Sequence, residues 1–264
     1  MRSLFVMLTA GAMMAGCATT GELRNPLARE TIYQVSTISA LQENVYDGTT
    51  TVGILKQRGD LGIGTFNALD GEMILLDGKV YRFGSDGSVT EMNDRTLTPF
   101  AVVTFFDPDF SQALTPMMTF GDFQVQADKM LPTLNLPYAV RIDGLFRAVK
   151  TRAPRRQARP YPRLIDALAN QPEFDYNDVH GTLVGFRLPQ YFNGVNVPGW
   201  HLHFISADRS KAGHVLSFTV LRAVFAYDVS PNLLMALPET GDFIGRDLTR
   251  DTSRELNTIE KGRR

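Results

Sequence analysis

The segment from Gly59 to Phe83, GDLGIGTFNALDGEMILLDGKVYRF, decides the fold. Asp-Gly pairs stand at Asp70-Gly71 and Asp77-Gly78, and a third follows at Asp86-Gly87. Asp-Gly is a strong short-range signal for a tight hairpin turn, and the runs between the pairs are of strand length. The chain from Val52 to Val89 is therefore predicted to be a β-meander. The glycines of GDLGIG are interpreted as turns and bulges, because no helix follows to complete a nucleotide loop.

Outward from this segment, the chain is rich in strands and poor in helices. Strands are predicted at 31–35, 99–106 and 139–149 and across a strand-rich second half at 179–226, which contains a wide turn at 194–199. Short helices are predicted at 37–45, with Ser36 or Thr37 as the cap, at 122–130 and at 163–170. Two packed sheets in an α+β, β-rich arrangement follow from this pattern.

Composition excludes some classes of partner. With 264 residues the chain can bury a sizeable core in one large domain or two small ones. Charged residues make up 21% and the net charge is −1, so no broad basic surface for nucleic acid is indicated. An anionic substrate must therefore be attracted locally, by a metal or by individual arginines.

The N-terminus has the features of an export signal. Arg2 provides a positive charge, an apolar run too short to span a bilayer follows, and Met14-Ala15-Gly16-Cys17 resembles the lipobox of bacterial lipoproteins. We expect a signal peptide at 1–16 cleaved before Cys17, a tether at 17–29 and a domain at 30–264 with two β-rich halves that meet near 150–175. Cys17, the only cysteine, is the predicted lipidation site, with a periplasmic protein anchored by lipid to the outer membrane. The alternative is an ordinary cleaved signal and a soluble periplasmic protein.

Three of the four histidines, His201, His203 and His214, fall within fourteen residues. Residues i and i+2 of a strand share a face, so His201 and His203 project side by side. A hairpin centred near residues 209 and 210 sets His214 opposite Ile205, diagonal to His203 and about 5–8 Å away at Cβ. Three histidines with an open fourth position are typical of a catalytic zinc site. The alternative is that they are scattered polar residues on a half-exposed strand pair.

Three further residues are candidates for an active site, but each can also be explained without one. Glu72 follows a tight turn on an otherwise apolar strand, so its side chain points either to solvent or into a pocket. Arg152 begins a run of five arginines that ends at Arg163, a run that is either a solvated face or the source of a carboxylate clamp. Glu260 lies near the C-terminus, where a disordered tail is the default expectation.

The chain as a whole resembles the acetolactate decarboxylase family. The resemblance runs in order from about residue 31 to 260. It is carried by the meander segment quoted above, by RIDGLFRAVKTRAPRRQARPYP and by FNGVNVPGWHLHFISADRSKAGHVLSF. It implies zinc held by His201, His203 and His214, an active site with Glu72, Arg152 and Glu260, and two related mixed-sheet subdomains with exchanged strands, commonly in a homodimer. Two features depart from the family: Arg58, where relatives often have His, and the lipoprotein-type leader.

The implied activity is that of a carboxy-lyase that decarboxylates 2-acetolactate to acetoin. The substrate's hydroxyl and carbonyl oxygens can chelate zinc, which stabilises the enediolate formed as CO₂ leaves. Arg152 is expected to hold the departing carboxylate or to help deliver the proton, and because a guanidinium is a poor acid, Glu72 and Glu260 are the better general acid–base candidates. The alternatives are a metal-dependent hydrolase and a non-catalytic metal-binding lipoprotein, and the second of these predicts that the glutamates and the arginine lie away from the histidines.

Overall fold

The computed structural model describes residues 29–239 and 241–261. The expected signal peptide at 1–16, Cys17 and nearly all of the tether lie outside the described residues. The helices are short and are listed here with their bounds: α2 (Ile38–Gln42), α3 (Val52–Lys56), α4 (Phe120–Met130), α5 (Leu164–Ala167), α6 (Gly241–Ile244) and α7 (Ser253–Lys261). None of the described helices is long and apolar enough to span a bilayer.

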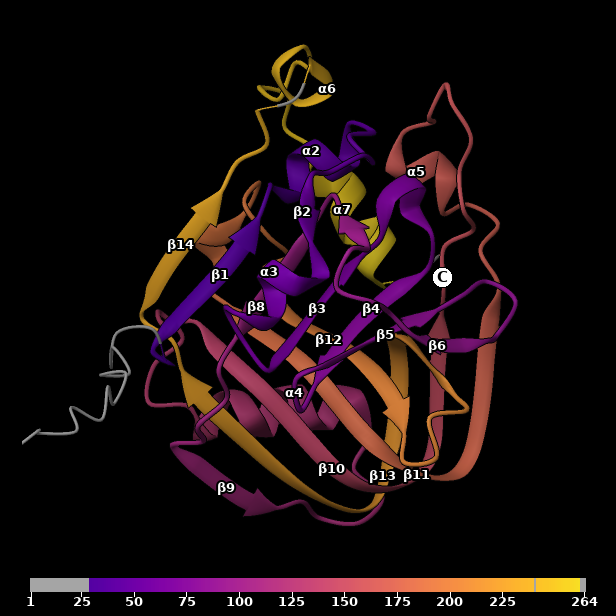
Figure 1. Cartoon of the computed structure of the whole chain (residues 1–264). Coiled ribbons are helices and arrows are strands. Elements are labelled where there is room, and N and C mark those ends of the chain that lie inside the picture. The colour runs from indigo at the N-terminus through magenta and orange to yellow at the C-terminus, as the bar shows by residue number, and fades with distance from the viewer. Residues whose placement is uncertain (1–28, 240, 262–264) are drawn as a thin grey trace, which may run out of the picture.

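The first sheet has seven strands in the order β14-β1-β8-β3-β4-β5-β6 (Figure 1). Its strands are β1 (Thr31–Val35), β3 (Leu61–Thr65), β4 (Glu72–Leu76), β5 (Lys79–Phe83), β6 (Val89–Glu91), β8 (Ala101–Thr104) and β14 (Asn232–Ala236). The predicted meander forms its β3 to β6 part, with antiparallel neighbours throughout. Two further short strands, β2 (Thr50–Thr51) and β7 (Leu97–Thr98), pair with each other.

Four strands of the second sheet pair with one another in a closed ring. The order of this sheet is β10-β11-β12-β13-β9, and β10 also pairs with β13. Its strands are β9 (Phe110–Ala113), β10 (Tyr138–Arg152), β11 (Glu173–Leu188), β12 (Gly199–Ser206) and β13 (Ala212–Val229). Strands are exchanged between the sheets, because β14 follows β13 in sequence yet pairs in parallel with β1. The expected β-rich α+β class with exchanged strands and few short helices is confirmed.

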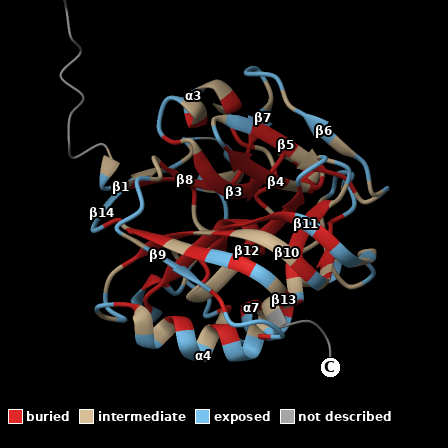
Figure 2. Cartoon of the chain, turned by 90° about the horizontal axis from the view of Figure 1, so that it is seen from below, coloured by how far each residue is buried: buried red, intermediate tan, exposed pale blue. Residues whose placement is uncertain are grey.

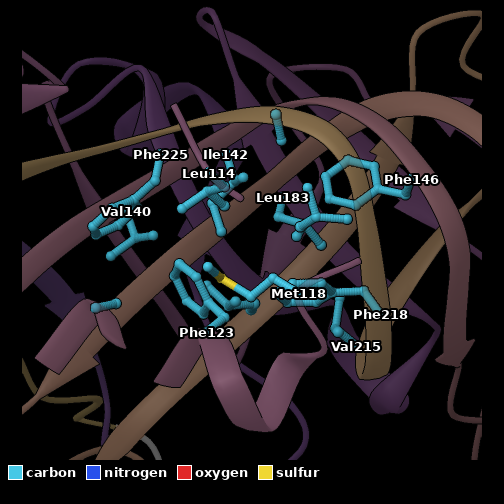
Figure 3. Close-up of a cluster of buried hydrophobic side chains, with 14 of the residues drawn as sticks. Leu114, Met118, Phe123, Val140, Ile142, Phe146, Leu183, Val215, Phe218 and Phe225 are labelled. Carbon is cyan, nitrogen blue, oxygen red and sulfur yellow. The ribbon is translucent and has the colours of Figure 1, made fainter. Parts of the chain in front are cut away.

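Buried apolar side chains form four clusters, two of which lie against the second sheet. One cluster lies between the sheets, where Ile63 and Ile74 face Phe186 and Ile205, and Figure 2 shows buried residues concentrated along this plane. A second cluster lies between the second sheet and α4, where Phe123 packs edge-on against Phe225 at 5.2 Å between ring centroids (Figure 3). The capping box of Thr119 and Asp122 begins α4, so this helix forms where the sequence predicts one.

Two local predictions were wrong. Val52–Lys56 is not part of the meander but the helix α3, because the Thr51 hydroxyl caps its first turn by accepting the Ile54 N–H. The glycines at 62 and 64 are not turns but interior positions of β3. A Cβ on Gly64 would lie 2.4 Å from the carbonyl oxygen of Phe100, so glycine permits the close approach of this backbone.

Candidate metal centre and active site

Three histidines converge on adjacent strands of the second sheet. His201 and His203 lie on β12, and His214 lies on β13 directly opposite His203. The ring centroids are 5.3 Å apart for His201 and His203, 5.0 Å for His201 and His214, and 5.3 Å for His203 and His214. One ligand nitrogen from each lies within 4.8 Å of the other two. This spacing allows one ion to be shared by all three imidazoles.

The pairing of the hairpin differs from the prediction by two residues. The sequence pattern placed His214 opposite Ile205, but His214 lies opposite His203. The turn is centred one residue earlier than expected, because the carboxylate of Asp208 accepts a backbone hydrogen bond from the residue two positions on and Arg209 takes a left-handed conformation with φ 60°. The correction moves the third histidine into a closer cross-strand position, which favours a shared ligand site.

The histidines are neutral, which is the form that binds a metal. Burial and, to a smaller extent, the Arg152 charge lower the pKa of His201 to about 3. Burial likewise lowers the pKa of His203 and of His214 well below the usual value of 6.5. His203 Nδ1 lies 2.9 Å from the Met73 carbonyl oxygen and therefore donates to it, so its Nε2 carries no proton.

Two buried imidazole nitrogens have no hydrogen-bond partner among the described residues, His203 Nε2 and His201 Nδ1. A buried polar atom without a partner costs free energy, so its presence requires an explanation such as a bound ion. Three neutral imidazoles, two of which have an unsatisfied nitrogen, are a donor set that suits zinc. The residues present therefore fit the predicted metal.

Two carboxylates flank the histidines. Glu72, the first residue of β4, points into the site rather than to solvent, and its Oε2 lies 3.5 Å from His203 Nε2. Glu260, in the last turn of α7, places its Oε2 3.5 Å from His214 Nε2. Burial raises the pKa of Glu72 to about 8, opposed by Arg152 and assisted by Glu260. Burial raises the pKa of Glu260 to about 7, opposed by Arg152. Both groups therefore exchange protons near neutral pH.

Arg152 completes the group from the end of β10, where it pairs in register with His214 on β13. Its side chain is buried, with a relative exposure of 4% for the residue. Nη2 lies 3.0 Å from His214 Nε2, and Nη1 donates to the carbonyl oxygen of Ile259 on α7. This arginine of the basic run is thus inside the site, whereas Arg155 and Arg156 of the same run are exposed.

Most of the remaining cavity wall is apolar. Much of it comes from the short helices α2, α5 and α7, which gather at one end of the molecule (Figure 1), and Leu69 and Phe100 add to it from outside these helices. The apolar lining residues are Ile38, Leu41, Leu69, Phe100, Leu164, Leu168 and Ile259. On the other side of His201, His214 and Glu260 lies a larger, more polar cavity of about 610 Å³. The site therefore combines an apolar surface for alkyl groups with charged groups for a carboxylate and a proton.

All six residues singled out by the sequence thus meet in one place. The non-catalytic alternative predicted that the glutamates and the arginine lie away from the histidines, and the distances contradict it. His180, the remaining histidine, is an exposed residue of β11 outside the site. Sequence reasoning missed the Met73 carbonyl that orients His203, since a backbone acceptor leaves no mark in the residue pattern. It also missed the apolar wall, whose leucines are indistinguishable from core residues by pattern.

Comparisons with known proteins identify relatives of this chain in one family. A family model described as alpha-acetolactate decarboxylase matches residues 32–250. The alpha-acetolactate decarboxylase of Methylococcus capsulatus is 44% identical over 242 residues, which cover 91% of this chain and 93% of that relative. The Bacillus subtilis enzyme of the same name is 41% identical over 241 residues, covering 91% of this chain and 94% of the relative. A crystal structure of the Bacillus subtilis protein superimposes with a TM-score of 0.86, covering 88% of this chain and all of that one.

Proposed function

The chain belongs to the alpha-acetolactate decarboxylase family, a family of carboxy-lyases, and on that premise we propose that it converts 2-acetolactate to acetoin and CO₂ with zinc at its three histidines. The observation that carries the proposal is the convergence of three neutral, buried imidazoles with one guanidinium and two protonatable carboxyl groups. A decarboxylase of a hydroxy-keto acid needs these parts: an electrophile for the carbonyl oxygen, a cation for the carboxylate and a proton donor.

His201, His203 and His214 would hold the zinc ion, which when bound would supply a Lewis acid for the negative charge arising on the substrate's carbonyl oxygen as CO₂ leaves. No organic electron sink is then required. No residue of the site has to form a covalent bond with the substrate.

Arg152 is proposed to bind the substrate's carboxylate. Its guanidinium is a planar fork that can donate two parallel hydrogen bonds, and it is held by the Ile259 carbonyl beside His214. This position brings the carboxylate next to the metal ligands before the carbon–carbon bond breaks. Because the guanidinium is always charged, Arg152 orients the anion but is a poor proton donor.

The proton is proposed to come from Glu72 or Glu260. Loss of CO₂ from the acetolactate anion leaves an enediolate, which takes up one proton at carbon to give acetoin, so one proton is consumed for each CO₂ released. At pH 7 a carboxyl group whose pKa is about 8 is mostly protonated, and Glu72 therefore holds a proton that it can donate. Glu260, with a pKa of about 7, is suited to accept or return a proton within the same cavity.

A ligand substitution tests the role of the metal. His203→Ala removes one of three protein ligands from a site that cannot replace it, so zinc affinity and turnover of acetolactate should both be lost. Metal analysis of the purified variant, beside wild-type protein treated with a chelator and then reloaded, is the measurement. Full zinc occupancy together with full activity in His203→Ala would remove the histidine assignment.

We also propose that the protein is exported and anchored by lipid at Cys17 on the periplasmic side of the outer membrane. The lipobox-like string at 14–17 and the single cysteine support this proposal. Stable anchoring requires more than one acyl chain. Full-length protein should partition with membranes and take up labelled lipid, and Cys17→Ser should abolish both. An unlabelled, fully soluble wild type would favour a simple cleaved signal.

A homodimer is proposed on the basis of the family resemblance alone. Light scattering of the purified mature protein measures its mass in solution. A mass of twice that of the chain is expected, and a monomer at micromolar concentration would contradict the proposal.

A further inference from the structure

Glu260 is the one residue of the proposed site that no strand holds. Its helix, α7, follows the long segment 237–252, whose described residues form no regular element except α6, and α7 lies against α2 and α5 in Figure 1. Leu256 and Ile259 are buried in the apolar cluster beside the cavity. Apolar packing is not directional, so it keeps α7 on this surface without fixing where along the surface its last turn lies. Directional contacts must set the position of Glu260.

One such contact is the donation from Arg152 to the Ile259 carbonyl at the end of α7, and the others are at the start of the helix. The buried amide of Gln42, the last residue of α2, makes a reciprocal pair with Thr252: Gln42 Nε2 donates to the Thr252 carbonyl at 3.1 Å, and the Thr252 hydroxyl donates to Gln42 Oε1 at 2.7 Å. Both residues are buried, with relative exposures of 2% and 5%. The same Thr252 carbonyl accepts the Leu256 N–H at 3.0 Å, which is the first hydrogen bond of the helix.

Ion pairs beside this hydrogen-bonded pair also connect the end of α2 with the start of α7. Arg163 bridges Glu43, which caps α2, and Glu255 in the first turn of α7, at 2.9 and 2.7 Å. Arg250 contacts the same two carboxylates at 3.3 and 2.7 Å. These groups are partly exposed and therefore contribute less than the buried pair. The amide–hydroxyl pair is the most specific of the contacts.

We propose that Gln42 is a positioning residue, which acts through Thr252 to fix the register of α7 and thereby the places of Glu260 and of the Ile259 carbonyl that holds Arg152. Eight residues separate Thr252 from Glu260, a rise of about 12 Å along a helix, so an error at the first turn is carried to the last. A displacement of about 1 Å in an active site can lower the rate by roughly 10²-fold. The inference rests on the proposed role of Glu260.

The decisive comparison is between Thr252→Val and Thr252→Ser. Valine keeps the shape of threonine and removes the hydroxyl, whereas serine keeps the hydroxyl and loses a methyl group. Positioning through the hydrogen bond requires the valine variant to be the worse enzyme: kcat should fall at least about tenfold with KM changed less than about threefold, while Thr252→Ser should stay within about threefold of wild type. A packing role predicts the opposite order.

Gln42→Met tests the other partner, and Gln34→Met is the matched control. Gln34 is also completely buried and hydrogen-bonded, through its donations to the Ser36 and Val195 carbonyls, but none of its hydrogen bonds among the described residues reaches α7. Both substitutions should lower the melting temperature. Gln42→Met should also lower kcat about as much as Thr252→Val and should leave zinc bound, because the histidines lie on β12 and β13. Gln34→Met should not lower kcat.

Two readouts separate positioning from general destabilisation. Amide hydrogen exchange at residues 256–261 should accelerate about tenfold in Thr252→Val and Gln42→Met but not in Thr252→Ser or Gln34→Met. In a Glu260→Gln background, Gln42→Met should cost less than about threefold more activity, because only its effect through the Ile259 carbonyl and Arg152 then remains.

The proposal is overturned if Thr252→Val turns over like wild type with unchanged exchange, or if Gln34→Met loses as much kcat as Gln42→Met. If wild-type protein does not decarboxylate acetolactate at all, the proposed function fails. The exchange comparison, which needs no substrate, still decides in that case whether Gln42 fixes the register of α7.

Discussion

Replacing Glu72 by glutamine removes the proton from the site with the least disturbance of its shape. The side chain is buried against His203, with Oε2 3.5 Å from Nε2. Because burial raises its pKa to about 8, the carboxyl group is mostly protonated and uncharged at pH 7, and the amide of glutamine reproduces that state in size and charge. Fold and zinc content should therefore be unchanged in Glu72→Gln.

The rate should change far more than the structure. An amide cannot donate a proton at the acidity of a carboxyl group, and loss of general acid catalysis costs roughly 10²–10⁴-fold in kcat. This range corresponds to about 2.7–5.5 kcal/mol added to the activation barrier. Since binding of the substrate's carboxylate is assigned to Arg152, KM should change by less than about threefold, and the loss should appear in kcat.

The assay is steady-state CO₂ release by protein of measured zinc content. Glu91→Gln is the matched control, because Glu91 is an exposed glutamate on β6 of the same sheet, and its turnover should equal that of wild type. If Glu72→Gln lost its zinc, Glu72 would be a ligand and proton transfer would pass to Glu260 or Arg152. A wild-type rate with zinc bound would refute the reasoning.

Three other predictions follow from the same structure. Arg152→Lys keeps the charge but cannot hold the Ile259 carbonyl and a carboxylate in one plane, so turnover should fall roughly 10²-fold with zinc retained, as measured by kinetics and metal analysis; a rate within twofold of wild type would contradict the clamp. Because the pKa of His201 is lowered to about 3 and those of His203 and His214 are well below 6.5, protons should not displace zinc at pH 5.5 in a dialysis experiment, and release with a midpoint near pH 6.5 would contradict neutral, buried ligands. Burial raises the folded-state pKa of Asp228 from 3.8 to about 7, so the folded state holds a proton that the unfolded state releases and stability falls as pH rises between those values. Asp228→Asn should therefore be more stable than wild type by about 4 kcal/mol at pH 8 and by less than about 1 kcal/mol at pH 4, measured by urea unfolding, and an equal difference at both pH values would count against this.

The sequence was sufficient where one local signal had one structural meaning. Asp-Gly turns fixed the meander, and the i, i+2 spacing of His201 and His203 required a shared face on any strand. It was insufficient where a hydrogen bond made by one side chain decided between two local backbone structures. The hydroxyl of Thr51 turned Val52–Lys56 into a helix, and Asp208 shortened the turn before His214. Neither outcome is visible in hydrophobic alternation.

The residues of the candidate site also differ in how far the sequence alone could place them. Glu72 and Arg152 lie on strands of the two sheets, yet their neighbours come from distant parts of the chain, so the residues alone left both solvent and pocket open as outcomes. Only the resemblance to the family indicated that these two side chains point into a pocket. For Glu260 the default expectation was a disordered tail, and only the contacts of α7 with Gln42 and Arg163, more than 90 residues away in sequence, show why an end of the chain can be ordered inside a site.

Product stoichiometry on acetolactate tests the central assignment most directly. Purified protein, stripped of metal and reloaded with zinc, is incubated with racemic 2-acetolactate while CO₂ and acetoin are both measured. One CO₂ per acetoin is expected, with activity lost on chelation and restored by zinc. Zinc-loaded, folded protein that forms neither product above the rate of spontaneous decay would contradict the assignment.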